Sequence, residues 1–198
     1  MSDARYGLGA PARLAQEVRK SKFVANAVNV TSEDAAMELL QQVADTAATH
    51  NCWAWRIGQR YRFSDDGEPA GTAGKPILQA IDGQCIDNVI VVVTRWFGGI
   101  KLGAGGLMRA YGGCAAECLR QAAKTQLIES VRVEFAVEFA ELARLRARAH
   151  ALDATIESED FADDGAVLHL VLPIARLDEL RILLADLSRG RAELRVLD

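Results

Sequence analysis

Apolar residues along the first two thirds of the chain recur at the spacings of strands and helices. The stretch Val89–Thr94 is apolar on both faces, which predicts a strand that is covered on both sides. From Gly106 to Ala122, apolar residues recur every three or four positions, which predicts an amphipathic helix whose buried face is mostly small. Upstream, the same patterns predict strands at residues 13–18, 23–30 and 52–57, and helices at residues 32–48 and 76–83.

The last third of the chain has a different order of elements. Its pattern predicts strands at residues 131–139, 155–161, 166–172 and 192–197, and helices at residues 140–152 and 175–189. This βαββαβ order is typical of the ferredoxin-like fold. We therefore predict an α+β protein of two domains, residues 1–125 and 126–198.

Charge changes near the same boundary. The chain has 198 residues and a net charge of −4, but residues 1–124 carry 14 Lys and Arg against 12 Asp and Glu, and the remainder carries 9 against 15. If either half binds an anion, we expect it to be the first. No apolar run approaches the ~20 residues that a membrane span needs. The first residues resemble no export or organelle signal and the four cysteines fit reduced thiols, so we expect a cytoplasmic protein without a membrane partner.

A glycine-rich basic segment connects the apolar strand to the long helix. Glycines allow the backbone to approach a ligand closely, the start of a helix presents free N–H groups, and cations supply formal charge, so this segment suits a phosphate or another anion. Its aromatic side chains could stack on a base. The alternative is a tight turn whose glycines serve packing and whose aromatics fill the core beneath it. The candidate residues are Arg95, Trp96, Phe97, Gly98, Gly99, Lys101, Gly103, Gly105 and Gly106, joined by Lys20 and Lys22 from the basic turn after the first predicted strand.

A second segment, Tyr61–Lys75, contains Asp66-Gly67, Glu68-Pro69 and three glycines in all, so we expect a long loop there and no regular element. Long loops inside compact domains are often functional. We interpret this loop as a second wall of the site. The candidate wall residues are Asp65, Asp66, Glu68, Thr72 and Lys75.

The spacing of these residues argues against several kinds of enzyme. A nucleotide-hydrolysing P-loop needs Lys-Ser/Thr at the start of the helix, where this chain has Gly106-Leu107, and the glycine order does not match the dinucleotide-binding fingerprint. The three histidines, His50, His150 and His169, are scattered over both predicted domains, which argues against a metal-dependent hydrolase. His50 with the acidic residues of Tyr61–Lys75 is the nearest approach to a hydrolytic cluster, and the alternative is a solvated acidic turn. We expect no cofactor and no metal.

The glycine-rich segment and its surroundings closely resemble the IMPACT/YigZ family. The family's signature is an apolar strand followed by R-[aromatic]-[aromatic]-G-G-x-K-L-G-x-G-G-L, which here runs from Arg95 to Leu107 and continues as Arg109-Ala110-Tyr111. Earlier family motifs are present as Ser21-Lys22-Phe23 and between Asp65 and Pro76. The resemblance covers nearly the whole chain.

The resemblance implies a first domain with the fold of the second domain of ribosomal protein S5, followed by a ferredoxin-like domain, in a pairing similar to the last two domains of elongation factor G. Because those relatives contact RNA, it also implies a nucleic-acid-binding or ribosome-associated protein. Eukaryotic members regulate a translation-stress kinase with an additional N-terminal domain that has no counterpart in this sequence, so we do not transfer that role.

We therefore expect a non-catalytic, RNA- or ribosome-associated binding protein with a role in translation regulation, which uses the glycine-rich basic loop to bind an anion or nucleic acid. One alternative is a hydrolase that acts on a small phosphorylated or peptidic substrate. Another is a module that binds a translation factor. The proline-dipeptidase label that some bacterial members carry does not fit the scattered histidines.

Overall fold

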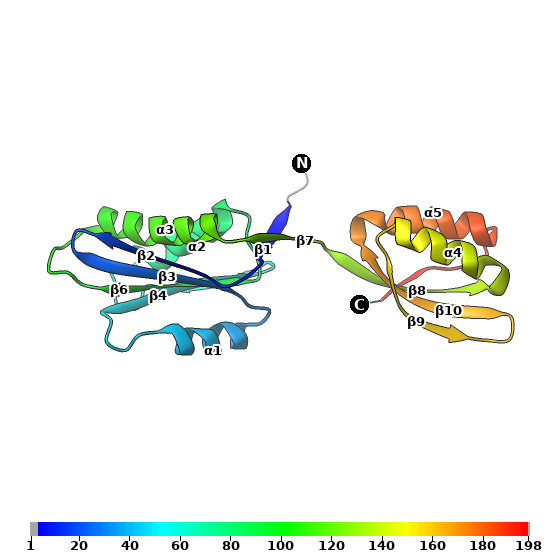
Figure 1. The fold of residues 1–198 in the computed structure, drawn as a ribbon, viewed down its shortest axis with the longest axis horizontal. Coiled ribbons are helices and arrows are strands. Elements are labelled where there is room, and N and C mark those ends of the chain that lie inside the picture. The colour runs from blue at the N-terminus through cyan, green and yellow to red at the C-terminus, as the bar shows by residue number, and fades with distance from the viewer. Residues whose placement is uncertain (1–3, 198) are drawn as a thin grey trace. The chain divides into compact units, whose positions relative to one another are not determined.

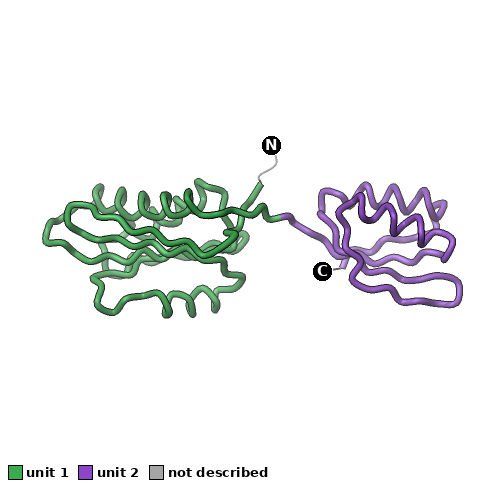
Figure 2. Tube along the Cα trace, viewed as in Figure 1, with its two compact units in different colours: residues 1–127 green, residues 128–198 purple. Residues whose placement is uncertain are grey.

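The computed structural model of the chain describes residues 4–197 and divides into two compact units, residues 1–127 and 128–198 (Figure 2). Residues 1–3 of the predicted first domain and residue 198 of the predicted second domain lie outside the described part. The boundary that the sequence suggested, between residues 125 and 126, falls inside the last strand of the first unit, β7 (Lys124–Leu127).

The first unit is built on a five-stranded antiparallel sheet. Strand β6 (Val89–Trp96) lies at its centre, and residues 89–93 are fully buried because helices cover both faces of the sheet. The predicted strand covered on both sides is confirmed. Across the sheet the order is β2 (Ala12–Val18), β3 (Ser21–Asn29), β6, β4 (His50–Ile57) and β5 (Arg60–Ser64).

Helices α2 (Gly74–Gly83) and α3 (Ala104–Gln121) pack on one face of this sheet, and α1 (Glu33–Val43) packs on the other (Figure 1). The Ser32 side chain caps α1 by accepting a hydrogen bond from the Ala35 N–H. The amphipathic pattern of α3 is confirmed, and its small residues let the helix lie close to the sheet. The buried residues of α3 are Leu107, Ala110, Tyr111, Cys114, Ala115, Cys118 and Leu119.

Three local predictions were wrong or incomplete. Residues 61–64 were expected in a loop but form β5, an edge strand that hydrogen-bonds to β4. The helix predicted to reach residue 48 ends at Val43, because the Asp45 side chain accepts the Ala47 N–H and begins a turn instead. A short ladder between β1 (Arg5–Leu8) and β7 was not predicted.

The second unit has a four-stranded antiparallel sheet with two helices on one face (Figure 1). The predicted βαββαβ element order is confirmed, and the strand order across the sheet is β11, β8, β10, β9. Val133, Phe135, Leu145 and Leu168 belong to the core between the sheet and the helices. The elements are β8 (Ser130–Glu138), α4 (Phe139–Ala151), β9 (Thr155–Phe161), β10 (Gly165–Pro173), the short 3-10 helix η1 (Ile174–Arg176), α5 (Leu177–Ser188) and β11 (Arg195–Leu197).

None of the helices formed by residues 4–197 has the length and apolar character that a membrane crossing requires.

Candidate functional site

The glycine loop, residues 97–103, connects β6 to α3 and lies directly against the β2–β3 turn. A Cβ on Gly98 would be 1.8 Å from the Lys20 carbonyl oxygen, so no other residue fits at position 98 without a shift of the backbone. The Gly98 N–H also donates to the Ser21 Oγ at 3.3 Å. Because of this close approach, the basic turn and the glycine loop, which are distant in sequence, form one surface.

Helix α3 begins two residues earlier than predicted. Gly103, with φ of 71°, is its N-cap, and Gly105 and Gly106 therefore lie in its first turn. That turn contains no acidic side chain, and the first hydrogen bond to the cap is made by the Leu107 N–H. The preceding N–H groups are free of helical partners and give this end of α3 a partial positive charge.

Arg95 lies beneath the glycine loop rather than on it. Its side chain is only 6% exposed, and its Nη1 pairs with the Glu68 Oε1 at 2.6 Å. Its Nη2 donates to the Ser21 Oγ at 3.3 Å. From the sequence we expected this guanidinium to face an anion; in the structure its charge is matched by a buried carboxylate, and it connects β6, the β2–β3 turn and the acidic loop.

The hydroxyl of Tyr111 completes this buried cluster by donating to the Glu68 Oε1 at 2.8 Å. Burial raises the pKa of Tyr111 well above its usual value, and the neighbouring Cys52 raises it further. Burial also raises the pKa of the Cys52 thiol to about 12. Both groups are therefore protonated at neutral pH, and neither supplies an accessible nucleophile.

The acidic loop, residues 65–73, is organised by Asp65. Its carboxylate accepts hydrogen bonds from the backbone N–H groups of Gly71, Ala73 and Gly74 at 2.8–2.9 Å. Partial burial raises the pKa of Asp65, but these three hydrogen bonds outweigh it, and the net pKa lies below the usual value. Asp65 thus stabilises the conformation of the loop, and its carboxylate is bound to backbone N–H groups of the same segment.

The remaining candidate wall residues do not converge on one point. The Asp66 carboxylate accepts the Asn51 N–H at 2.5 Å, and the Thr72 hydroxyl donates to the Pro69 carbonyl at 2.7 Å. Lys75 is exposed at the start of α2. The four acidic and hydroxyl groups of the loop are therefore each held by separate partners, in contrast to the convergent carboxylates of a hydrolytic centre.

His50 contacts the acidic loop at two points. Its Nδ1 lies 2.7 Å from the Asp66 carbonyl oxygen, and its Nε2 lies 3.7 Å from the Glu68 Oε1. Within residues 4–197, no group of three or more His, Cys, Asp or Glu side chains is placed to hold a metal ion. The acidic loop therefore gives the hydrolase alternative no pair of unpartnered carboxylates, and the described residues give it no metal-holding group.

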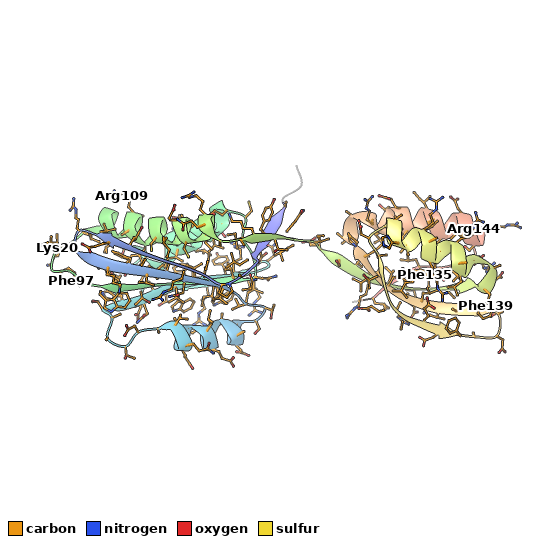
Figure 3. All side chains as sticks on the ribbon, in the orientation of Figure 1. Lys20, Phe97, Arg109, Phe135, Phe139 and Arg144 are labelled. Carbon is orange, nitrogen blue, oxygen red and sulfur yellow. The ribbon has the colours of Figure 1, made fainter. Side chains whose placement is uncertain are left out.

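A set of exposed cations surrounds the glycine loop, and we call it the basic end. In the part of the chain that the structure describes, none of these cations has a carboxylate within 4.0 Å, whereas Arg5, Arg56, Arg60 and Arg62 elsewhere in the first unit are all ion-paired. Figure 3 shows Lys20, Phe97 and Arg109 together at one end of this unit. The basic end consists of Arg19, Lys20, Lys22, Lys101 and Arg109.

Two members of the basic end, Arg19 and Arg109, were not among the site residues predicted from the sequence. Arg109 follows Gly105 by one helical turn, which is the signal that could have identified it. The aromatic candidates differ in exposure: Phe97 is 47% exposed, whereas Trp96 is half-buried with the Lys22 Nζ 4.9 Å from its ring. Phe97 is therefore the ring available for stacking.

Two family models match the chain. Residues 19–119 match the Impact N-terminal domain, and residues 135–191 match a domain of unknown function, DUF1949. The first match contains the basic end, the glycine loop and the acidic loop, and the second lies within the second unit.

Curated relatives match over most of the chain. An IMPACT family member of Thermus thermophilus is 46% identical over 177 residues, which cover 88% of this chain and 97% of that protein. IMPACT family member YigZ of Escherichia coli (strain K12) is 35% identical over 192 residues, which cover 93% and 94%. The Protein IMPACT homolog of Saccharomyces cerevisiae is 43% identical over 95 residues, which cover 43% of this chain and 36% of that protein.

A solved structure agrees with the two-unit α+β architecture. The crystal structure of a hypothetical protein aligns with a TM-score of 0.69 and 33% sequence identity, and the alignment covers 100% of this chain and 99% of that one.

Proposed function

The chain belongs to the IMPACT family, and we propose that it is a non-catalytic protein that binds RNA, on the ribosome or associated with it, through the basic end of its first unit. The eukaryotic relatives named Protein IMPACT fit a translation-related regulatory role for the family. The finer fold assignment belongs to the same proposal: a first unit like domain 2 of ribosomal protein S5, and a ferredoxin-like second unit. The strand order β11, β8, β10, β9 supports the latter.

The observation that carries the proposal is the set of five cations around a glycine loop, none of them ion-paired within residues 4–197. Elsewhere in the first unit Arg5, Arg56, Arg60 and Arg62 have carboxylate partners, whereas Arg13, Lys75 and Lys124 have none among residues 4–197. The basic end differs from these three in that it brings five such cations around one loop, although the chain has a net charge of −4. Exposed Lys and Arg attract phosphates, and phosphate contacts give binding that depends on salt and only weakly on sequence. The free N–H groups of α3 add to this potential.

Each element of the site has a separate task in this proposal. Lys20, Lys22 and Lys101 contact phosphates, and the exposed ring of Phe97 stacks on a base. Arg95 acts indirectly, because its buried pair with Glu68 holds the glycine loop and the β2–β3 turn in place. The direct phosphate contact that the sequence suggested for Arg95 is thus assigned to the lysines above it.

Co-sedimentation with ribosomes tests the proposal. We expect the wild-type protein to sediment with ribosomes, the Lys20→Ala/Lys22→Ala/Lys101→Ala variant to stay in the supernatant, and treatment with a nuclease that digests exposed RNA to release the wild type.

The second unit offers a matched control for this experiment. Arg144→Ala/Arg148→Ala/Arg189→Ala also removes three cations, none of which has an ion-pair partner among residues 4–197, and it should sediment like the wild type. Sedimentation that survives nuclease treatment, or that is lost equally in both variants, would contradict RNA binding at the basic end and would favour a translation factor as the partner.

A further inference from the structure

A groove lies between strand β2 and helix α3 and opens beside the basic end. Its volume is about 650 Å³, within the roughly 300–1,000 Å³ of typical small-ligand sites. Gln16 and Val18 of β2 form one wall, Ala110 and Gly113 of α3 form the other, and Leu102 of the glycine loop lies at one end. None of these residues belongs to the site that the sequence predicted.

The groove exists because β2 is an edge strand and α3 presents small residues to it. Gly106, Ala110 and Gly113 lack the side chains that would fill the space next to the sheet edge. The Gln16 Nε2 spans the gap and donates to the Ala110 carbonyl oxygen at 3.3 Å, which fixes the distance between strand and helix. The groove is therefore a built feature of the fold and does not depend on a mobile loop.

The charge of the groove is asymmetric. Arg19 and Arg109 line the groove, and neither has a carboxylate within 4.0 Å in the described part of the chain. The Arg109 side chain lies beside the first turn of α3: its Nη1 is 3.5 Å from the position that a Cβ on Gly105 would occupy. At the other end, the Glu117 carboxylate already accepts hydrogen bonds from Arg120 and Gln121. An anionic chain would thus enter from the glycine loop, where the cations are free.

We propose that this groove holds a splayed-out nucleotide of a single RNA strand, so that the protein selects single-stranded RNA over duplex RNA. The inference rests on the proposed function and adds the form of RNA that is bound. Arg19 and Arg109 contact the phosphates, and the apolar groups of Val18, Leu102 and Ala110 face the base. A single strand can turn a base outward into such a groove, whereas the bases of a duplex are stacked inside the helix.

Gly113→Leu tests the groove without removing any cation of the basic end. A Cβ on Gly113 meets nothing within 4 Å, so a leucine there occupies the groove without a clash in the core, and leucine is a better helix former than glycine. Gly83→Leu is the matched control, because Gly83 is also helical with open space at its Cβ position but lies on α2, outside the groove. Gly113→Met serves as a second filling variant, and thermal unfolding checks that each variant is folded.

The measurement is fluorescence anisotropy with two probes, an oligouridine of about ten nucleotides and a blunt RNA duplex of the same length. We expect the wild type to bind the single strand more tightly than the duplex. Both Gly113 variants should bind the single strand about tenfold more weakly than the wild type does, and the duplex with unchanged affinity. Gly83→Leu should bind both probes like the wild type. Equal binding of both probes by the wild type, or Gly113 variants that bind the single strand normally, would overturn the groove assignment while RNA binding itself stands. Failure of the wild type to bind either probe would instead overturn the proposed function.

Discussion

The buried pair of Glu68 and Arg95 gives the sharpest prediction about what holds the site together. Glu68→Leu removes the carboxylate that faces the guanidinium at 2.6 Å and that also accepts the Tyr111 hydroxyl. Arg95 is then left buried without a carboxylate. Its remaining contacts are the Ser21 hydroxyl at 3.3 Å and the rings of Phe23 and Phe97, whose centroids lie 5.6 and 5.5 Å from its Cζ, and its Nε has no hydrogen-bond partner among the described residues. The substitution therefore leaves the positive charge of Arg95 buried without a counter-charge.

The expected loss in free energy of unfolding follows from this unpaired buried charge. Removal of one partner of a buried ion pair costs about 3–5 kcal/mol, which is a large part of the roughly 5–15 kcal/mol that stabilises a typical domain. We expect Glu68→Leu and Arg95→Met each to lower the free energy of unfolding of the first unit by about 3–5 kcal/mol. In the double variant neither charge remains, and its destabilisation should be at least about 2 kcal/mol smaller than the sum of the two single effects.

Urea unfolding followed by tryptophan fluorescence measures these effects in the first unit alone, because all three tryptophans, Trp53, Trp55 and Trp96, lie there. Glu33→Ala is the control: its carboxylate pairs with exposed arginines on β5, and the destabilisation should stay below about 1 kcal/mol. If Glu68→Leu costs no more than this control, or if the two single effects simply add, the pair does not hold the site as we describe.

Three further predictions concern the same unit. Gly98→Ala should lower the urea midpoint by the equivalent of about 1–3 kcal/mol or more, because its Cβ would overlap the Lys20 carbonyl. Gly83→Ala, whose Cβ meets open space, should leave the midpoint unchanged. Equal midpoints for the two variants would contradict the close approach of Gly98 to Lys20. The pKa of Asp65 is lowered in the folded state, so its stabilisation is present above pH 4 or so and is lost as the pH falls through the folded pKa. Asp65→Asn should therefore be less stable than the wild type at pH 7, with the gap in free energy of unfolding closing in acid, and a gap that is constant with pH would refute this. Cys85 is the exposed cysteine, so a thiol reagent at pH 8 should modify it rapidly, and rapid modification of a second thiol before unfolding would contradict the burial of Cys52, Cys114 and Cys118.

Periodicity in the sequence was enough to predict the elements that bury a face. The spacing of small and apolar residues in α3 and the apolar run of β6 predict which residues are buried, because a position that faces the core favours an apolar side chain. Strand β5 was missed because every residue from Arg60 to Phe63 is exposed, and the hydrogen bonds to β4 that define it leave no apolar pattern.

The site was harder to predict because charge in a sequence does not reveal burial. Arg95 and Glu68 are 27 positions apart and were assigned to opposite walls of a cleft, yet they form one buried pair. Lys20 and Lys22 were placed beside the glycine loop from the sequence, and the contact of Gly98 with Lys20 supplies the physical reason for that proximity. Arg109 was noted in the family signature but was not assigned to the site, because an exposed cation on a helix usually belongs to a solvated face.

The measurement that most directly tests RNA binding at the basic end is the salt dependence of that binding. The dissociation constant of the wild type for oligouridine should rise with salt. Lys20→Ala/Lys22→Ala/Lys101→Ala should both weaken binding and reduce the slope of log K against log salt by about 0.7 for each phosphate that a lysine no longer neutralises. The Arg144→Ala/Arg148→Ala/Arg189→Ala control should keep the wild-type slope. A slope that is unchanged by removal of the three lysines, or reduced equally by the control, would contradict the assignment of phosphate binding to the basic end.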